Sequence, residues 1–309
     1  MFQTSKHFTT LLSLGFYLAL ITAPGISHAA TPGAPIVVTI KPLYSLVAKL
    51  TEGIEEPVLL MKQMPSPHHY SMRPSERRLL SDARVIVWVG PQMETSLSRI
   101  ISQQDALVIT VMQANGVKKL ERRTKHGHRH PADHAHANEI SIDPHIWLSI
   151  RNATAICKHI FQQLVASDPE NTARYQANLR RLTDRMTQLS RKIDAELNNN
   201  RQPFITYHDA YQYFEDEHQL NHIDSISFDE EAGISLKHLH HITDSIEKND
   251  VRCLLYQSPK PDIVDSLTKK SQLAAFALDP LGLDLDDENE AWFQIMLSTA
   301  ATFKQCLAH

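Results

Sequence analysis

Apolar residues along the chain fall into short β-branched runs that alternate with longer amphipathic stretches. The short runs predict strands, because β-branched residues pack well on a pleated surface and continuous apolar runs of this length suit strands buried on both faces. Two sets of such runs occur: Ile36–Ile40, Val58–Met61, Arg84–Val89 and Leu107–Val111, then Phe204–Tyr207, Cys253–Tyr256 and Ala274–Leu278.

Amphipathic stretches separate most of these runs and predict helices over Leu43–Thr51, Ser75–Ser81, Leu236–Lys248 and Ile263–Ser271. Strands that alternate with helices favour mostly parallel sheets with helices on both faces. The sequence therefore predicts an α/β fold with two lobes, each built on a mostly parallel sheet flanked by helices.

One long helix is predicted between the two sets of strands. We expect Asp168 to cap it and Pro169 to occupy its first turn, where a missing N–H is tolerated. Apolar residues then recur at three- and four-residue steps, and Asn198–Asn200 ends the pattern. About 30 residues at 1.5 Å each span roughly 45 Å, which is long enough to join two lobes. An ordinary core helix of a single domain is the alternative. The predicted division is 30–167, a linking helix at 168–200, and 201–309.

The N-terminal residues 1–29 have the character of a secretory signal. Lys6 precedes the apolar run Leu11–Ala23, and Ser27–Ala29 fits the small-x-small cleavage pattern. The run is short for a membrane span, although an anchor or a buried helix is the alternative. No cysteine lies near the cleavage point, so a lipid anchor is not expected. We therefore predict a monomeric protein exported to the periplasm.

Composition narrows the function. The formal net charge is −4 and no basic stripe occurs, so nucleic acid is not an expected partner.

In an oxidising compartment two of the three cysteines should pair. Cys157 lies in a helical pattern and is expected to be buried and free, whereas Cys253 begins a strand-like run and Cys306 ends the last helical stretch. We expect a Cys253–Cys306 disulfide; three free thiols are the alternative.

Histidine is unusually abundant, with 18 residues. Residues 125–138 read KHGHRHPADHAHAN and contain almost nothing that could pack into a core, so a surface loop is expected. Imidazole suits zinc, copper and nickel, so the density of histidines indicates metal binding. Binding is expected to be weak, because nothing preorganises the loop. A soluble low-complexity insertion is the alternative. The candidate secondary ligands are His126, His128, His130, His134 and His136.

Four further residues, His68, His145, His208 and Asp279, lie beside predicted strand ends or turns. Ligands of open α/β sheets bind outside the carboxyl ends of the strands, so two facing lobes would bring these side chains to one cleft. Three imidazoles and a carboxylate can form a tetrahedral zinc site. A single histidine at a strand end, taken alone, is more often a surface or hydrogen-bonded core residue than a metal ligand.

Longer motifs surround these positions. They read SPHHYSMRPS at 66–75, DPHIWLS at 143–149, TYHDAYQYF at 206–214 and LDPLG at 278–282. In this order, and with the histidine-rich stretch before the second motif, the sequence resembles the high-affinity zinc-binding proteins of bacterial ABC importers. These are the ZnuA type of the metal-binding cluster of solute-binding proteins, and the resemblance covers nearly the whole chain after residue 29.

The resemblance implies two α/β lobes joined by a rigid helix, Zn²⁺ in the cleft, and an inner-membrane ABC permease as partner. It assigns His68 rather than His69 as a ligand, together with His145 and His208, and gives the fourth place to Asp279 or to water. It also implies the disulfide. The chain departs from its relatives at Gln257, where they look to have an acidic residue.

Three other functions compete with zinc delivery. Manganese-binding relatives look to have a carboxylate in place of His208, and a hard ion prefers more oxygen ligands than this set offers. A zinc buffer or adhesin without a transporter would need the same ligands. A zinc hydrolase is disfavoured, because the sequence has no His-Glu-x-x-His motif and no clearly placed general base. The chain is therefore not expected to be an enzyme.

Overall fold

The computed structural model describes residues 1, 33–62, 66–123, 141–198, 200–228 and 234–309. Residues Thr31–His309 belong to one compact unit. Among the described residues, no helix combines the length and the apolar character that crossing a membrane would require.

The first sheet consists of four parallel strands in the order β2-β1-β3-β4. The strands are β1 (Ile36–Val38), β2 (Val58–Leu59), β3 (Val85–Trp88) and β4 (Leu107–Thr110). Helices α1 (Lys41–Leu50), α2 (Pro74–Ser81) and α3 (Ser98–Ile101) lie in the connections between them. Since all four strands run the same way, their carboxyl ends meet at one edge of the sheet, as the sequence predicted.

The second sheet repeats this plan with the order β6-β5-β7-β8, again parallel throughout. Its elements are β5 (Phe204–His208), α6 (Gln212–His218), β6 (His222–Ser227), α7 (Leu236–Lys248), β7 (Cys253–Gln257), α8 (Asp262–Ser271) and β8 (Ala274–Leu278). Strand β6 was not predicted, because it reads HIDSIS and lacks the continuous apolar run that marked the other strands. It lies at the edge of the sheet, where polar side chains are tolerated.

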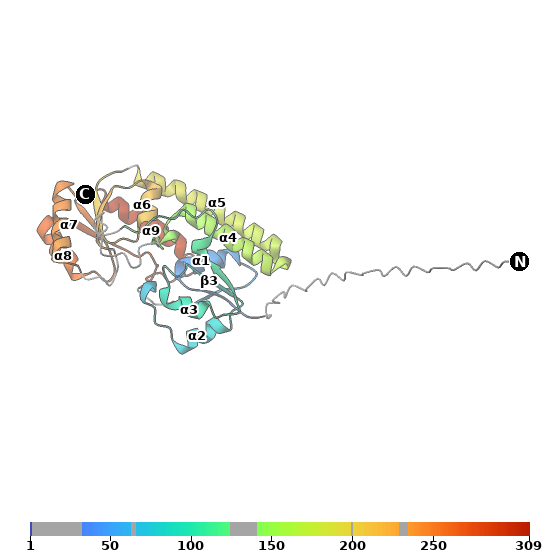
Figure 1. The fold of residues 1–309 in the computed structure, drawn as a ribbon. Helices are drawn as coiled ribbons and strands as arrows, with labels where there is room; N and C mark the ends of the chain where they lie inside the picture. The colour runs from blue at the N-terminus through green and yellow to red at the C-terminus, as the bar shows by residue number, and fades with distance from the viewer. Residues whose placement is uncertain (2–32, 63–65, 124–140, 199, 229–233) are drawn as a thin grey trace. The chain divides into compact units, whose positions relative to one another are not determined.

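A helical layer connects the two sheets (Figure 1). It contains α4 (Ile150–Ser167), α5 (Thr172–Leu197) and α9 (Ala291–Cys306). Helix α5 contacts α4 and α9, and both α5 and α9 contact α1 beside the first sheet. The predicted long helix is therefore confirmed as an element that joins the two halves of the fold.

The long helical segment begins at Pro169, as predicted, but its first turn, Pro169–Asn171, is a 3-10 helix and α5 follows with Asn171 as its N-cap. Asp168 occupies the N-cap position of the 3-10 turn. Its side chain makes no capping hydrogen bond, and its Oδ2 accepts hydrogen bonds from Asn171 Nδ2 and the Tyr175 hydroxyl. The predicted end is correct: α5 stops where Asn198 adopts the left-handed conformation.

Shorter 3-10 helices among the described residues are η1 (Pro67–His69), η2 (Thr95–Leu97), η3 (Val111–Gln113), η4 (Ile146–Leu148) and η5 (Pro169–Asn171). Two of them, η1 and η4, contain or follow a predicted ligand. A proline fixes the local backbone of each: Pro67 is the first residue of η1, and Pro144 lies two residues before η4.

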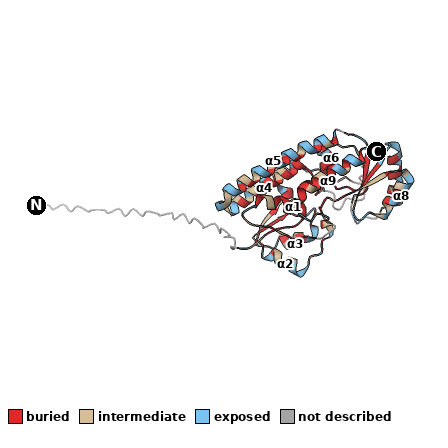
Figure 2. Ribbon diagram, turned by 180° about the vertical axis from the view of Figure 1, so that it is seen from behind, coloured by how far each residue is buried: buried red, intermediate tan, exposed pale blue. Residues whose placement is uncertain are grey.

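One hydrophobic core extends through both sheets, and a smaller one lies on the other face of the second sheet (Figure 2). Successive residues of β5 illustrate the division: Phe204 packs into the large core and Ile205 into the small one. This follows from the alternation of side chains along a strand, and it explains why both faces are apolar. The predicted Cys253–Cys306 disulfide is confirmed and ties β7 to α9, while Cys157 is buried and free.

Candidate metal centre

His68 lies in η1, in the connection that follows β2. The Ser66 hydroxyl accepts a hydrogen bond from the His68 backbone N–H at 3.4 Å, which caps the short turn. Pro67 is buried at the first position of the turn, where its fixed φ suits a helical start. The imidazole of His68 is thereby presented at the carboxyl end of the first sheet.

His145 precedes η4 and is held by the side chain of Asp143. The Asp143 Oδ1 accepts the backbone N–H of His145 at 3.0 Å and lies 2.7 Å from its Nδ1. A carboxylate can only accept, so Nδ1 carries the proton and Nε2 is the nitrogen available to a metal. Such carboxylate–histidine pairs orient metal ligands and make them more basic.

Burial affects the two partners of this pair differently. It raises the pKa of Asp143 to about 7, whereas the hydrogen bond from His145 and the nearby Arg122 and Arg123 act against that rise. Burial, assisted by Arg122, lowers the pKa of His145 to about 3. His145 is therefore neutral at physiological pH, and a metal ion requires the neutral form of imidazole.

His208 is the last residue of β5, the strand that pairs with both β6 and β7. Its side chain is buried, and its backbone lies opposite Ser227 in the adjacent strand. A residue at the end of a central strand has little freedom to shift. The backbone of His208 is thus fixed by strand pairing, and the second sheet contributes this imidazole to the site.

These three histidines come together in the structure. Their candidate ligand nitrogens all lie within 4.8 Å of one another. The ring centroid of His145 lies 5.5 Å from that of His68 and 5.3 Å from that of His208, and the centroids of His68 and His208 are 6.3 Å apart. In a tetrahedral zinc site with bonds of about 2.05 Å the nitrogens are about 3.3 Å apart, so small side-chain rotations suffice to reach it.

The fourth predicted ligand is not part of this cluster. Asp279 follows β8 and accepts backbone hydrogen bonds from Leu281 (3.3 Å) and Asp284 (3.2 Å). It lines a cavity with Gln257 and Pro280, and it is absent from the one group of candidate ligands found among the described residues. Its role as a ligand remains a prediction.

The histidine-rich stretch lies outside the described residues, so His126, His128, His130, His134 and His136 remain predictions. His69, adjacent to His68, has its ring centroid 6.4 Å from that of His68 and does not belong to the cluster. The assignment of His68 rather than His69 as a ligand stays a prediction.

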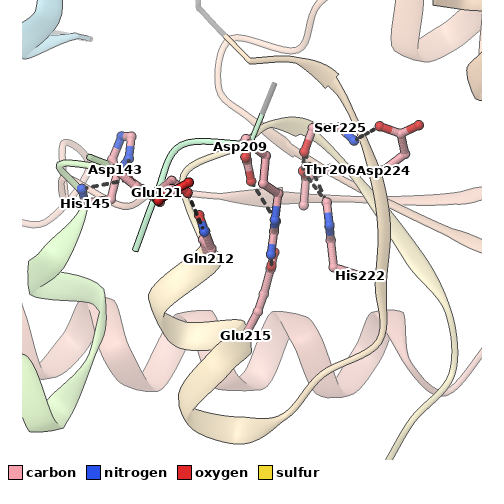
Figure 3. Close-up of polar contacts among 11 residues, drawn as sticks. Glu121, Asp143, His145, Thr206, Asp209, Gln212, Glu215, His222, Asp224 and Ser225 are labelled. Carbon is pink, nitrogen blue, oxygen red and sulfur yellow. Dashed lines mark hydrogen bonds and ion pairs between the residues drawn. The ribbon is translucent and has the colours of Figure 1, made fainter. Parts of the chain in front are cut away.

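Sequence reasoning missed the polar residues that surround the histidines. Asp143 was noted only as part of a motif, although a carboxyl two residues before a histidine could have suggested its orienting role. Asp209 was likewise noted only as part of a motif, and Glu215 was not singled out. Both are buried and both pair with Arg123, which lies far from them in the sequence. Figure 3 shows how Asp209 and Glu215 lie with respect to each other.

The fold and the three converging histidines define a two-sheet α/β protein with a candidate metal centre between its strand ends. A crystal structure of ZnuA superposes with a TM-score of 0.73 at 21% identity, over 88% of this chain and 98% of that one. The SBP FpvC from Pseudomonas aeruginosa in complex with Mn²⁺ gives a TM-score of 0.75 at 21% identity, over 89% and 98%. The fold is therefore one that metal-binding proteins use.

The sequence comparison is more specific. The model of the family described as zinc-uptake complex component A, periplasmic, matches residues 36–306. The high-affinity zinc uptake system protein ZnuA of Brucella suis biovar 1 is 32% identical over 306 residues, which covers 88% of this chain and 91% of that protein. The chain belongs to this ZnuA family of uptake-complex components, and the resemblance inferred from its motifs is confirmed.

Proposed function

We propose that the chain binds one Zn²⁺ tightly through His68, His145 and His208 and delivers it to an ABC permease for uptake. The observation that carries this proposal is the convergence of three imidazoles from two sheets, with nitrogens within 4.8 Å of one another. The names of its relatives, which refer to zinc uptake, support the same metal. Asp279 or a water molecule would complete the coordination.

The donor set favours zinc over manganese. Imidazole is a borderline ligand that suits zinc, whereas manganese prefers carboxylate, carbonyl and water oxygens. The hydrogen bond from His145 Nδ1 to Asp143 adds negative charge behind one ligand, which strengthens its bond to a cation. The fold alone does not decide between the two ions, because the SBP FpvC has the same fold in complex with Mn²⁺.

We further propose that residues 1–29 are a cleavable signal, that the mature chain works in the periplasm, and that it is not an enzyme. The predicted lobes, 30–167 and 201–309, would each supply part of the centre. The five histidines of residues 126–136 would collect zinc weakly. Their deletion should remove weak equivalents and leave the tight one.

The decisive experiment is zinc titration of the His208→Ala protein in competition with a chelator. His69→Ala is the matched control, because His69 lies outside the cluster. We expect His208→Ala to abolish tight binding and His69→Ala to leave it unchanged. Equal affinity in the two variants would refute the proposed site. Growth of a deletion strain in chelator separates an importer component, whose loss starves the cell of zinc, from a buffer, whose loss does not.

A further inference from the structure

Two segments that flank the histidine-rich stretch in the sequence pair with each other next to the metal centre. We call Leu120–Arg123 and Ser141–Asp143 the paired segments. The Arg122 N–H donates to the Ser141 carbonyl at 2.8 Å, and the Asp143 N–H donates to the Leu120 carbonyl at 2.9 Å. Asp143 also forms a hydrogen bond with the His145 ring, so the paired segments support one of the proposed ligands, His145.

Helix α6, which follows His208 in the chain, binds these segments through its polar residues. The Tyr213 hydroxyl donates to the Asp143 carbonyl at 2.7 Å and accepts the Leu120 N–H at 3.1 Å. Gln212 Nε2 donates to the Glu121 carbonyl at 2.9 Å, as Figure 3 shows. The surroundings of His145 and those of His208 are therefore in direct contact.

Arg123 makes the strongest of these connections. Its Nη1 donates to Asp209 Oδ1 at 2.8 Å, and its Nη2 donates to Glu215 Oε2 at 2.6 Å. The side chains of Asp209 and Glu215 are only 6% and 3% exposed. One guanidinium thus joins two buried carboxylates, a geometry for which the planar fork of arginine is suited and the single ammonium of lysine is not.

Both carboxylates lie close to His208 in the chain, so the ion pairs with Arg123 bear on the position of His208. Asp209 is the residue directly after His208, and Glu215 lies in α6, which begins four residues after His208. Through these hydrogen bonds, Arg123 links the turn after His208 to the paired segments next to His145. The two nitrogens that must meet a single ion come from opposite sides of this contact.

We propose that Arg123 is a positioning residue of the metal centre, which keeps His208 and His145 at the spacing zinc requires. This inference rests on the proposed function. Groups that orient metal ligands commonly change affinity by about ten- to a hundredfold when they are removed. A rigid interface is needed because the ligand nitrogens must be held within a fraction of an ångström of their bonded positions.

The first test compares Arg123→Met with a matched variant of the same interface. Lys118 pairs with Asp216 on α6 at 2.6 Å, but the two side chains are 45% and 37% exposed. An exposed pair contributes little, so Lys118→Met should leave zinc affinity within about twofold of wild type. We expect Arg123→Met to weaken the tight site at least about tenfold, measured by chelator competition, and Arg123→Lys to restore part of the loss.

A double-mutant cycle separates positioning from general stability. If Arg123 acts through His208, Arg123→Met should have little further effect on the residual zinc affinity of the His208→Ala protein. An equal loss in both backgrounds, or wild-type affinity in Arg123→Met, would overturn the inference. His208→Ala alone tests the proposed function, so the two can fail separately.

Removing the guanidinium leaves two buried carboxylates unpaired, and this could prevent folding. The triple variant Arg123→Met, Asp209→Asn, Glu215→Gln removes the charges together with the bridge. We expect it to fold and to bind zinc at least about tenfold more weakly than wild type, because the bridge is still missing. Wild-type zinc affinity in this folded variant would count against a positioning role.

Discussion

A buried lysine at the start of α1 provides the sharpest test of how the two sheets are held together. Lys41 is 6% exposed, and its Nζ donates to the carbonyls of Gly282 at 2.7 Å and Leu285 at 2.9 Å, with a longer contact to Leu283 at 3.4 Å. These carbonyls belong to the loop that follows Asp279. Lys41→Met keeps the apolar stem and removes all three contacts.

The size of the effect follows from what the substitution leaves behind. Methionine avoids the cost of burying an ammonium, so the loss comes from the carbonyls that Lys41 contacts. The Gly282 carbonyl keeps a second donor, the Leu285 N–H at 3.2 Å, whereas the half-buried Leu285 carbonyl loses its described donor. An unsatisfied buried polar group costs about 1–3 kcal/mol. We therefore expect Lys41→Met to lower the free energy of unfolding by about 1 to 3 kcal/mol.

Lys49 on the same helix is the control. Its Nζ lies 2.6 Å from Glu290 Oε1, but Glu290 keeps a second partner in Arg185, so Lys49→Met should cost less than about 1 kcal/mol. Urea unfolding followed by circular dichroism measures both, and an unchanged slope with a lower midpoint reports lost stability. If the two variants unfold at the same urea concentration, the buried contact does not stabilise the fold as argued.

Three other outcomes can be measured on the same protein. Replacing Cys253 and Cys306 by serine opens a cross-link with a sequence separation of 53, and the loop-entropy model predicts a loss of about 4 kcal/mol in urea unfolding under oxidising conditions. Asp143→Asn keeps the acceptor for His145 but removes its charge, so zinc affinity in chelator competition should fall about tenfold. Burial raises the pKa of Glu94 to about 7, so the carboxyl favours folding at low pH and this contribution is lost as pH rises through 7. The stability of Glu94→Gln should therefore depend less on pH between 5 and 8 than that of wild type, by up to about 3 kcal/mol.

The strands that could be predicted from the sequence were those with continuous apolar runs. Two of the central strands, β1 and β5, are buried on both faces, so their composition alone identified them. Strand β6 carries His222, Asp224 and Ser225 and was missed, because an edge strand need not be apolar. Tertiary pairing, not local preference, makes it a strand.

The candidate centre was predictable to a similar extent. Position at a strand end drew attention to His208, and neighbouring prolines drew attention to His68 and His145. The resemblance of the surrounding motifs to the zinc-binding family then assigned all three as ligands. The pairing of Arg123 with Asp209 and Glu215 could not, because it joins residues more than 80 positions apart in the sequence. Asp279 shows that position at a strand end does not by itself identify a ligand. It follows a strand, but its described side-chain hydrogen bonds are with its own loop.

The three proposed ligands come from separate elements, so the proposed site would link metal affinity to the packing between the sheets. Trp147 Nε1 donates to the Pro280 carbonyl at 2.9 Å, and Trp292 Nε1 donates to the Trp147 carbonyl at 2.8 Å, both within the large core. These contacts lie two residues beyond His145 and one beyond Asp279. A shift of about an ångström between the sheets would lengthen the bond to one imidazole well beyond the roughly 2.0–2.1 Å that zinc requires. If the proposed site holds zinc, we expect a small displacement of the second sheet to weaken binding, and we expect bound zinc in turn to stabilise the packed arrangement of both sheets.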